Sequence, residues 1–153
     1  MAATWNTELI YEVGRMIGNN CLAADVVCLY GPGSNTHRTP YGGRNFEYYS
    51  EDPLLTAKQA AALVKGVQSE RIAATPKHFA LNNKESNRAL SDSRASERAI
   101  REIYIRQFEL IVKEARTIQN GTPTDGPPKS KTSVRRLPIP PDLLARLREE
   151  KAR

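Results

Sequence analysis

Three basic side chains stand where they could bind a polar ligand. Lys77 and His78 directly follow a short apolar run, and Arg44 lies in a glycine-rich segment. Together they offer hydrogen-bond donors of different reach, a combination suited to holding the hydroxyls of a ligand. The alternative is structural: Lys77 is solvated, His78 is a satisfied histidine, and Arg44 pairs with Glu47 or Glu51. Spacing alone favours this alternative and leaves the binding site as a hypothesis.

Acidic residues near Arg44 raise a second kind of chemistry. Glu47, Glu51 and Asp52 could suggest the two carboxylates that glycoside hydrolysis requires. Asp52 precedes a proline and is better explained as a helix cap, and the glutamates are expected to order the loop. The two histidines of the chain have no third ligand at recognisable spacing, so we predict no metal site. The turn at residues 31–33 matches neither nucleotide-binding glycine pattern, and no cofactor is predicted.

The apolar pattern predicts the elements that position these side chains. Apolar residues at helical spacing indicate a helix over residues 6–21, and Asp52-Pro53 begins a second helix that ends near residue 69. Short apolar runs predict strands at residues 26–30, buried on both faces, and 72–75. Ser96 should cap a long helix, whose apolar face is Ile100, Ile103, Tyr104, Phe108 and Ile111.

This order of elements predicts an α/β fold with a parallel, right-handed βαβ unit. Long loops over residues 31–52 and 77–94 both leave the carboxyl ends of the strands. Ligands bind at that edge in α/β sheets and barrels, so we expect Arg44, Lys77 and His78 to converge there.

Composition divides the 153 residues into two pieces. The net charge is +6, and residues 118–153 hold eight Lys or Arg against four acids, a net +4, together with six of the ten prolines. We therefore predict one domain over residues 1–116 and a separate basic, proline-rich tail over 117–153. The longest apolar run is five residues and no secretory signal is readable, which predicts a cytoplasmic chain without a membrane span. Two cysteines cannot build a disulfide framework, so buried thiols are expected.

Three motifs resemble glycoside hydrolase family 3, the β-glucosidase and β-xylosidase family. They are residues 31–53 (GPGSNTHRTPYGGRNFEYYSEDP), residues 76–83 (PKHFALNN) and the helix from residue 92 to 115, and the resemblance covers about residues 3–116. It implies part of a (β/α)8 barrel, retaining hydrolysis of a β-linked glucoside or xyloside, and no cofactor. It also implies that Arg44, Lys77 and His78 bind hydroxyls of the sugar before the scissile bond.

The sequence also departs from the family pattern. The resemblance implies a nucleophilic aspartate in a Ser-Asp-Trp-like segment, but the only Ser-Asp here is Ser91-Asp92, followed by Ser93, and the only tryptophan is Trp5. The segment that supplies the general acid is not found either. We therefore expect a truncated barrel fragment with no catalytic residue of its own and no turnover. Its uncovered sheet edges are expected to self-associate.

Residues 126–150 resemble a hairpin and helix of phage-type tyrosine recombinases. The resemblance would match Lys129 or Lys131 to the hairpin lysine of that family, and Arg135 and Arg136 add to a nucleic-acid-binding surface that ends in a short helix. The alternative is a basic disordered tail. A third hypothesis keeps residues 1–116 as a non-catalytic sugar-binding module.

Overall fold

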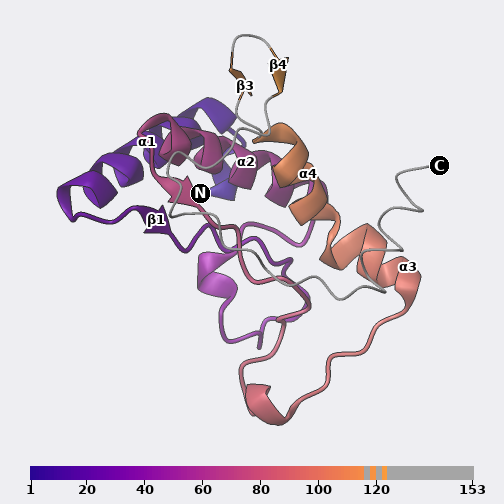
Figure 1. Ribbon diagram of the computed structural model, residues 1–153. Helices are drawn as coiled ribbons and strands as arrows, with labels where there is room; N and C mark the ends of the chain where they lie inside the picture. Colours follow the sequence, from indigo (N-terminus) through magenta and orange to yellow (C-terminus); the bar gives the residue numbers. More distant parts are fainter. Residues whose placement is uncertain (116–117, 120–121, 124–153) are drawn as a thin grey trace, which may run out of the picture. The chain divides into compact units, whose positions relative to one another are not determined.

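The computed structural model describes residues 1–115 and two short strands beyond them (Figure 1). The chain divides into two units, Met1–Arg116 and Thr117–Arg153. In the second unit, β3 (Ile118–Gln119) pairs antiparallel with β4 (Thr122–Pro123). The short helix predicted for the end of the tail lies outside the described residues. That residues 1–116 form a domain and residues 117–153 a separate tail stays a prediction.

Two long helices pack against each other in the first unit. They are α1 (Thr7–Ala23) and α2 (Pro53–Ser69), close to the predicted limits. The Asn6 side chain accepts a hydrogen bond from the backbone of Leu9, and Asp52 accepts one from Leu54. These caps satisfy backbone donors that the first turn of a helix leaves free. The predicted role of Asp52 as a helix cap is therefore confirmed, and Asn6 caps α1 in the same way.

Three glycines bring the backbones of α1 and α2 together. A Cβ atom added at Gly66 would overlap the carbonyl oxygen of Tyr11, and one at Gly14 would overlap that of Leu63. At Gly18 it would lie 2.9 Å from the Cβ atom of a glutamate side chain. The two helices therefore pack backbone against backbone, with no room for a methyl group between them.

Helix α2 supplies residues to both apolar clusters of the unit. Ala57, Ala60 and Val64 pack in one cluster with Ile111, and Leu63 and Val67 pack in the other with residues of α1 and with Ile72. Because α2 is covered on both sides, ten of its residues are buried. It is the central element of the core, and the Thr56 hydroxyl donates to the Ser50 carbonyl at the end of the first loop.

Strands β1 (Cys28–Leu29) and β2 (Ala73–Ala74) form a parallel pair, with Cys28 beside Ala73 and Leu29 beside Ala74. The predicted parallel βαβ unit is confirmed, although both strands are shorter than predicted. The expected burial of residues 26–30 on both faces is wrong, because Val27 is 78% exposed and Tyr30 is 77% exposed. Within the described residues β1 pairs only with β2, so its other edge lies uncovered.

The third predicted helix is interrupted. It consists of α3 (Glu97–Ala99), the π-helical turn η4 (Ile100–Tyr104) and α4 (Arg106–Glu114). Ser96 caps it as predicted, through a hydrogen bond from Ala99. A π turn holds more residues than an α turn, so the apolar positions on its two sides do not form one continuous stripe. Phe108 and Ile111 are buried, whereas Ile100, Ile103 and Tyr104 are only half-buried.

Two further expectations can be compared with the structure. No helix in the described part of the chain is long and apolar enough to cross a bilayer. A cytoplasmic location stays a prediction. Both cysteines are free thiols; Cys21 is buried as predicted, but Cys28 is half-buried, with its Sγ atom 3.3 Å from the hydroxyl of Thr75.

Candidate functional site

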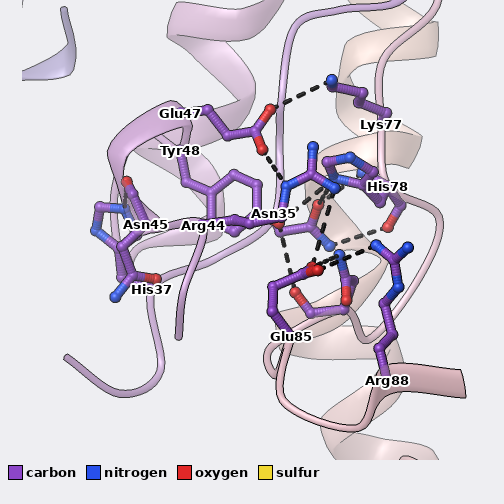
Figure 2. Close-up of polar contacts among 11 residues, drawn as sticks. Asn35, His37, Arg44, Asn45, Glu47, Tyr48, Lys77, His78, Glu85 and Arg88 are labelled. Carbon is purple, nitrogen blue, oxygen red and sulfur yellow. Dashed lines mark hydrogen bonds and ion pairs between the residues drawn. The ribbon is translucent and has the colours of Figure 1, made fainter. Parts of the chain in front are cut away.

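The two long loops begin side by side at the carboxyl edge of the sheet. Beyond the strands, the backbone of Lys77 donates to the carbonyl of Pro32 over 2.9 Å, and its own carbonyl accepts from Ser34. These bonds extend the parallel pairing to a bridge between Gly33 and Lys77. The predicted convergence is therefore observed in space: Arg44, Lys77 and His78 are brought together (Figure 2).

Asn35 fixes the backbone and the ring of His78. Its side-chain amide donates to the His78 carbonyl over 2.9 Å, and its Oδ1 atom accepts from the His78 backbone over 2.6 Å (Figure 2). The same oxygen lies 3.2 Å from the ring atom Nδ1. Asn35 is only 3% exposed, so this contact is shielded from water. A buried, doubly bonded amide holds the histidine in one orientation.

Tyr48 packs against the same imidazole. Its hydroxyl lies 3.4 Å from His78 Nδ1 and donates to the carbonyl of Asn82, and the two rings meet edge to face at 6.0 Å. Both oxygens near Nδ1 act as acceptors, so we assign the proton to Nδ1. Burial, followed by the charge of Arg44, lowers the pKa of His78 below 6.5. At neutral pH, Nε2 of His78 is thus an acceptor directed away from the Asn35 contact.

Glu47 binds both other cations of the site. The turn η2 (Asn45–Glu47) places it three residues beyond Arg44, whose Nε atom donates to one carboxylate oxygen; Lys77 Nζ lies 3.3 Å from the other (Figure 2). Burial would raise the pKa of Glu47, but the hydrogen bonds from Arg44 and Lys77 outweigh it, and that pKa falls below 4.5. The predicted pairing of Arg44 with Glu47 is confirmed. The Lys77 side chain is 30% exposed and pairs with Glu47, so it is only partly solvated.

Glu51 has a different role from Glu47. Its carboxylate accepts a hydrogen bond from the Ser50 hydroxyl over 3.3 Å. Glu47 therefore orders the loop through Arg44, as predicted, whereas Glu51 bonds the neighbouring Ser50 hydroxyl rather than Arg44 or a backbone amide.

Glu85, in the second loop, approaches Arg44 from another direction. Its carboxylate oxygen lies 3.9 Å from the Arg44 Nη1 atom and accepts a hydrogen bond from Asn82. The sequence did not reveal the roles of Asn35, Tyr48 or Glu85, because each contacts a site residue at least 30 positions away in the chain. For Asn35 a signal existed, since the parallel pairing of the strands also places its loop beside that of His78.

The arrangement can bind hydroxyl groups but is poorly suited to acid–base catalysis. Arg44 and Lys77 donate hydrogen bonds, and neutral His78 accepts one, which matches the mixed character of a hydroxyl. The Glu47 carboxylate is ionised and held by two cations, so it is not placed to release a proton to a substrate. In the part of the chain that the structure describes, no three His, Cys, Asp or Glu side chains form a possible metal site.

Two of the hollows in the described part of the chain bear on where a ligand could bind. A cavity of about 280 Å³ borders the first loop and is lined by His37, Arg38, Thr39, Pro40 and Asn45. A larger groove of about 840 Å³ lies among α1, α2 and the end of α4, and neither Arg44, Lys77 nor His78 lines it. Shape alone would favour the larger groove, whereas the convergent polar side chains lie at the strand ends.

Comparison with known proteins adds independent information. A family model described as "Glycosyl hydrolase family 3 N terminal domain" matches residues 1–120. Beta-glucosidase A of Butyrivibrio fibrisolvens is 62% identical over 114 residues, which are 74% of this chain and 14% of that protein. An exo-alpha-(1->6)-L-arabinopyranosidase of Bifidobacterium breve is 49% identical over 115 residues, 75% of this chain and 15% of that protein.

Solved structures show the same likeness. The structure of beta-glucosidase 3B from Thermotoga neapolitana in complex with glucose superposes with a TM-score of 0.74 at 51% identity, covering 75% of this chain and 16% of that one. The chain thus spans about one sixth or less of the length of these relatives.

The predicted recombinase-like segment finds no support in these comparisons. The family match ends at residue 120, before that segment begins. Its candidate residues, Lys129, Lys131, Arg135 and Arg136, all lie outside the described residues.

Proposed function

The chain belongs to glycosyl hydrolase family 3, and on that premise we propose that its strand-end loops form part of a site for the non-reducing sugar of a β-glucoside. The observation that carries the proposal is the convergence of Arg44, Lys77 and His78 at the carboxyl edge of the sheet. Support comes from the Thermotoga relative, whose structure is a complex with glucose. We further propose that the βαβ unit belongs to a (β/α)8 barrel.

Each of the three side chains has a distinct proposed role. Lys77 donates from a flexible stem while Glu47 holds its ammonium group 3.3 Å away. Arg44 donates from a guanidinium whose Nε is already bound to Glu47, so its outer nitrogens are directed to the sugar. His78 accepts a hydrogen bond from a sugar hydroxyl at Nε2, because its Nδ1 faces Asn35. A glucoside and a xyloside both present hydroxyls that such a set would bind.

Hydrolysis of an O-glycosyl bond, with retention, is the activity we propose for a whole family protein. It requires an acid and a nucleophilic carboxylate on either side of the bond. Of the carboxylates at the described site, Glu47 is bound by two cations and Glu85 contacts Asn82 and Arg88. We therefore assign this chain the binding of the sugar and expect no turnover from it by itself.

Glucose titration tests the proposed site. We expect saturable changes in the side-chain NMR signals of Lys77 and His78, and we expect Lys77→Ala to weaken the affinity about 5- to 20-fold, the loss of one charge-assisted hydrogen bond. Lys113→Ala is the matched control, because Lys113 also pairs with a glutamate, Glu109, but on α4. Equal affinities for wild type and Lys77→Ala would refute the role of Lys77, and an unsaturable wild-type response would refute the site.

We also propose that β1 mediates self-association through its uncovered edge. Val27 and Tyr30, which flank β1, expose apolar side chains. Among the described residues β1 pairs with β2 alone, and the other edge of such a strand is a template for strand pairing. A charge on an edge strand opposes such pairing, so Val27→Lys should raise the fraction of monomer in sedimentation velocity. Val112→Lys, at an exposed valine of α4, should leave the distribution unchanged. A wild-type chain that remains monomeric at high concentration would contradict this proposal.

A further inference from the structure

We infer that Glu85 is a positioning residue that orients the Arg44 guanidinium toward the bound sugar, an inference that rests on the proposed function. Glu85 lies in the second loop, and its carboxylate is 3.9 Å from Arg44 Nη1. Glu47 holds the Nε atom of the same guanidinium. Figure 2 shows the two carboxylates on different sides of Arg44. With both in place, the planar group has one preferred orientation.

The Glu85 carboxylate is itself fixed. Asn82 donates to one of its oxygens over 3.0 Å, and Arg88 donates to the other over 3.1 Å. A surface glutamate that pairs with one neighbour rotates freely and contributes little. A carboxylate held from both oxygens keeps its place, so it can set the direction of a third group. Arg88 also offsets part of the charge that Glu85 brings to the site.

The backbone before Arg44 is shaped to receive Glu85. A Cβ atom at Gly43 would lie 3.0 Å from Glu85 Cβ and 3.1 Å from its Cγ, and Gly43 has a φ of +77°, which favours glycine. The stem of Glu85 thus packs directly on the peptide that leads to Arg44. Asn83 ties the same loop down by donating to the carbonyl of Thr36 over 2.9 Å. The two loops are joined at the point where Arg44 leaves the backbone.

The contact with Arg44 is electrostatic rather than a hydrogen bond. A separation of 3.9 Å exceeds the usual 2.7 to 3.2 Å of an N–H···O bond, but the charges are partly shielded from water, which strengthens their attraction. Glu85 therefore biases the direction of the guanidinium without accepting a hydrogen bond from its Nη1 atom. The donors on Nη1 stay available to a hydroxyl, which distinguishes the role of Glu85 from that of Glu47.

Nuclear magnetic resonance of the full chain tests this inference. The Nε–Hε cross-peak of Arg44, assigned by its loss in Arg44→Lys, should shift in Glu85→Gln, and glucose affinity should fall about 3- to 10-fold. Glu85→Asp keeps the charge and should restore part of the affinity. The thermal midpoint should remain near that of wild type, whereas a merely structural role would lower it. The control is Glu109→Gln, which removes a carboxylate paired with Arg106 and Lys113 on α4.

The outcomes separate this inference from the proposed function. An unmoved Arg44 cross-peak in Glu85→Gln overturns the inference, whatever the affinity for glucose. A shifted cross-peak in a chain that does not bind glucose supports the orienting contact and refutes the sugar site. A shifted cross-peak with weakened glucose binding, partly rescued by Glu85→Asp, supports both.

Discussion

Gly66→Ala is expected to reduce the free energy of unfolding by at least about 3 kcal/mol. The added methyl group would overlap the carbonyl oxygen of Tyr11 and would lie 2.9 Å from the backbone nitrogen of Arg15. Both obstacles are backbone atoms of α1, so no side-chain rotation removes the overlap. Helices α1 and α2 must instead separate, which loosens the cluster that contains Leu63 and Val67.

Helix propensity acts in the opposite direction, because alanine is favoured over glycine inside a helix by about 1 kcal/mol. The overlap is expected to outweigh this gain, since the apolar packing of two 17-residue helices depends on their close approach. Without the backbone contact, Gly66→Ala would stabilise α2 and raise the unfolding midpoint. The sign of the change therefore tests whether the crossing is as close as observed.

Urea unfolding followed by circular dichroism at 222 nm measures this effect. Gly31→Ala is the matched control, because a Cβ atom there would meet nothing closer than 3.6 Å, a side-chain atom of Leu29. It should change stability by less than about 1 kcal/mol. A Gly66→Ala chain as stable as wild type would show that α1 and α2 can move apart without loss.

The same crossing shows what the sequence can and cannot predict. The limits of α1 and α2 follow from local signals, because Asn6 and Asp52 cap their first turns and apolar residues recur at helical spacing. The contact at Gly14 and Gly66 is not local, since the two residues are far apart in the chain. A glycine inside a helix predicts weaker helicity, but it does not indicate which segment of backbone packs against it.

Strand burial and the partners of the site residues also depend on contacts between distant parts of the chain. An apolar run such as residues 26–30 predicts a strand, but its burial depends on neighbours that are not encoded in the run, and Val27 is exposed. The convergence of Arg44 and Lys77 followed from parallel topology alone. The partners Asn35 and Glu85 required side-chain directions in two irregular loops, for which no periodicity exists.

Glu47→Gln is expected to disable the proposed site by acting on two of its donors at once. Glutamine keeps the shape of Glu47 but removes the charge that neutralises Arg44 and Lys77 together. The two cations would then face each other with only the Glu85 carboxylate, 3.9 Å from Arg44, as a counter-charge, in a place where the Glu47 side chain is only 18% exposed. We expect glucose affinity to fall at least about 10-fold, and stability to fall by about 1 to 3 kcal/mol.

The pH dependence of that loss identifies its cause. The folded chain holds the Glu47 carboxyl with a pKa below 4.5, whereas the unfolded chain has the ordinary value, so the unfolded state binds more protons. The stabilisation is therefore fully present above pH 4.5 and disappears as the pH falls through the lowered pKa. The stability difference between wild type and Glu47→Gln should be largest at neutral pH and should shrink below pH 4.5.

Unfolding of both chains between pH 7 and pH 3 measures this difference directly. Glu51→Gln, at a glutamate that accepts a hydrogen bond from the adjacent Ser50 hydroxyl, is the control and should give a small, nearly constant difference. A constant gap between wild type and Glu47→Gln across that range would mean that packing rather than charge is lost. Because the carboxylate binds both cations, a gap that closes with acid would mean that one ionised group organises both donors of the proposed sugar site.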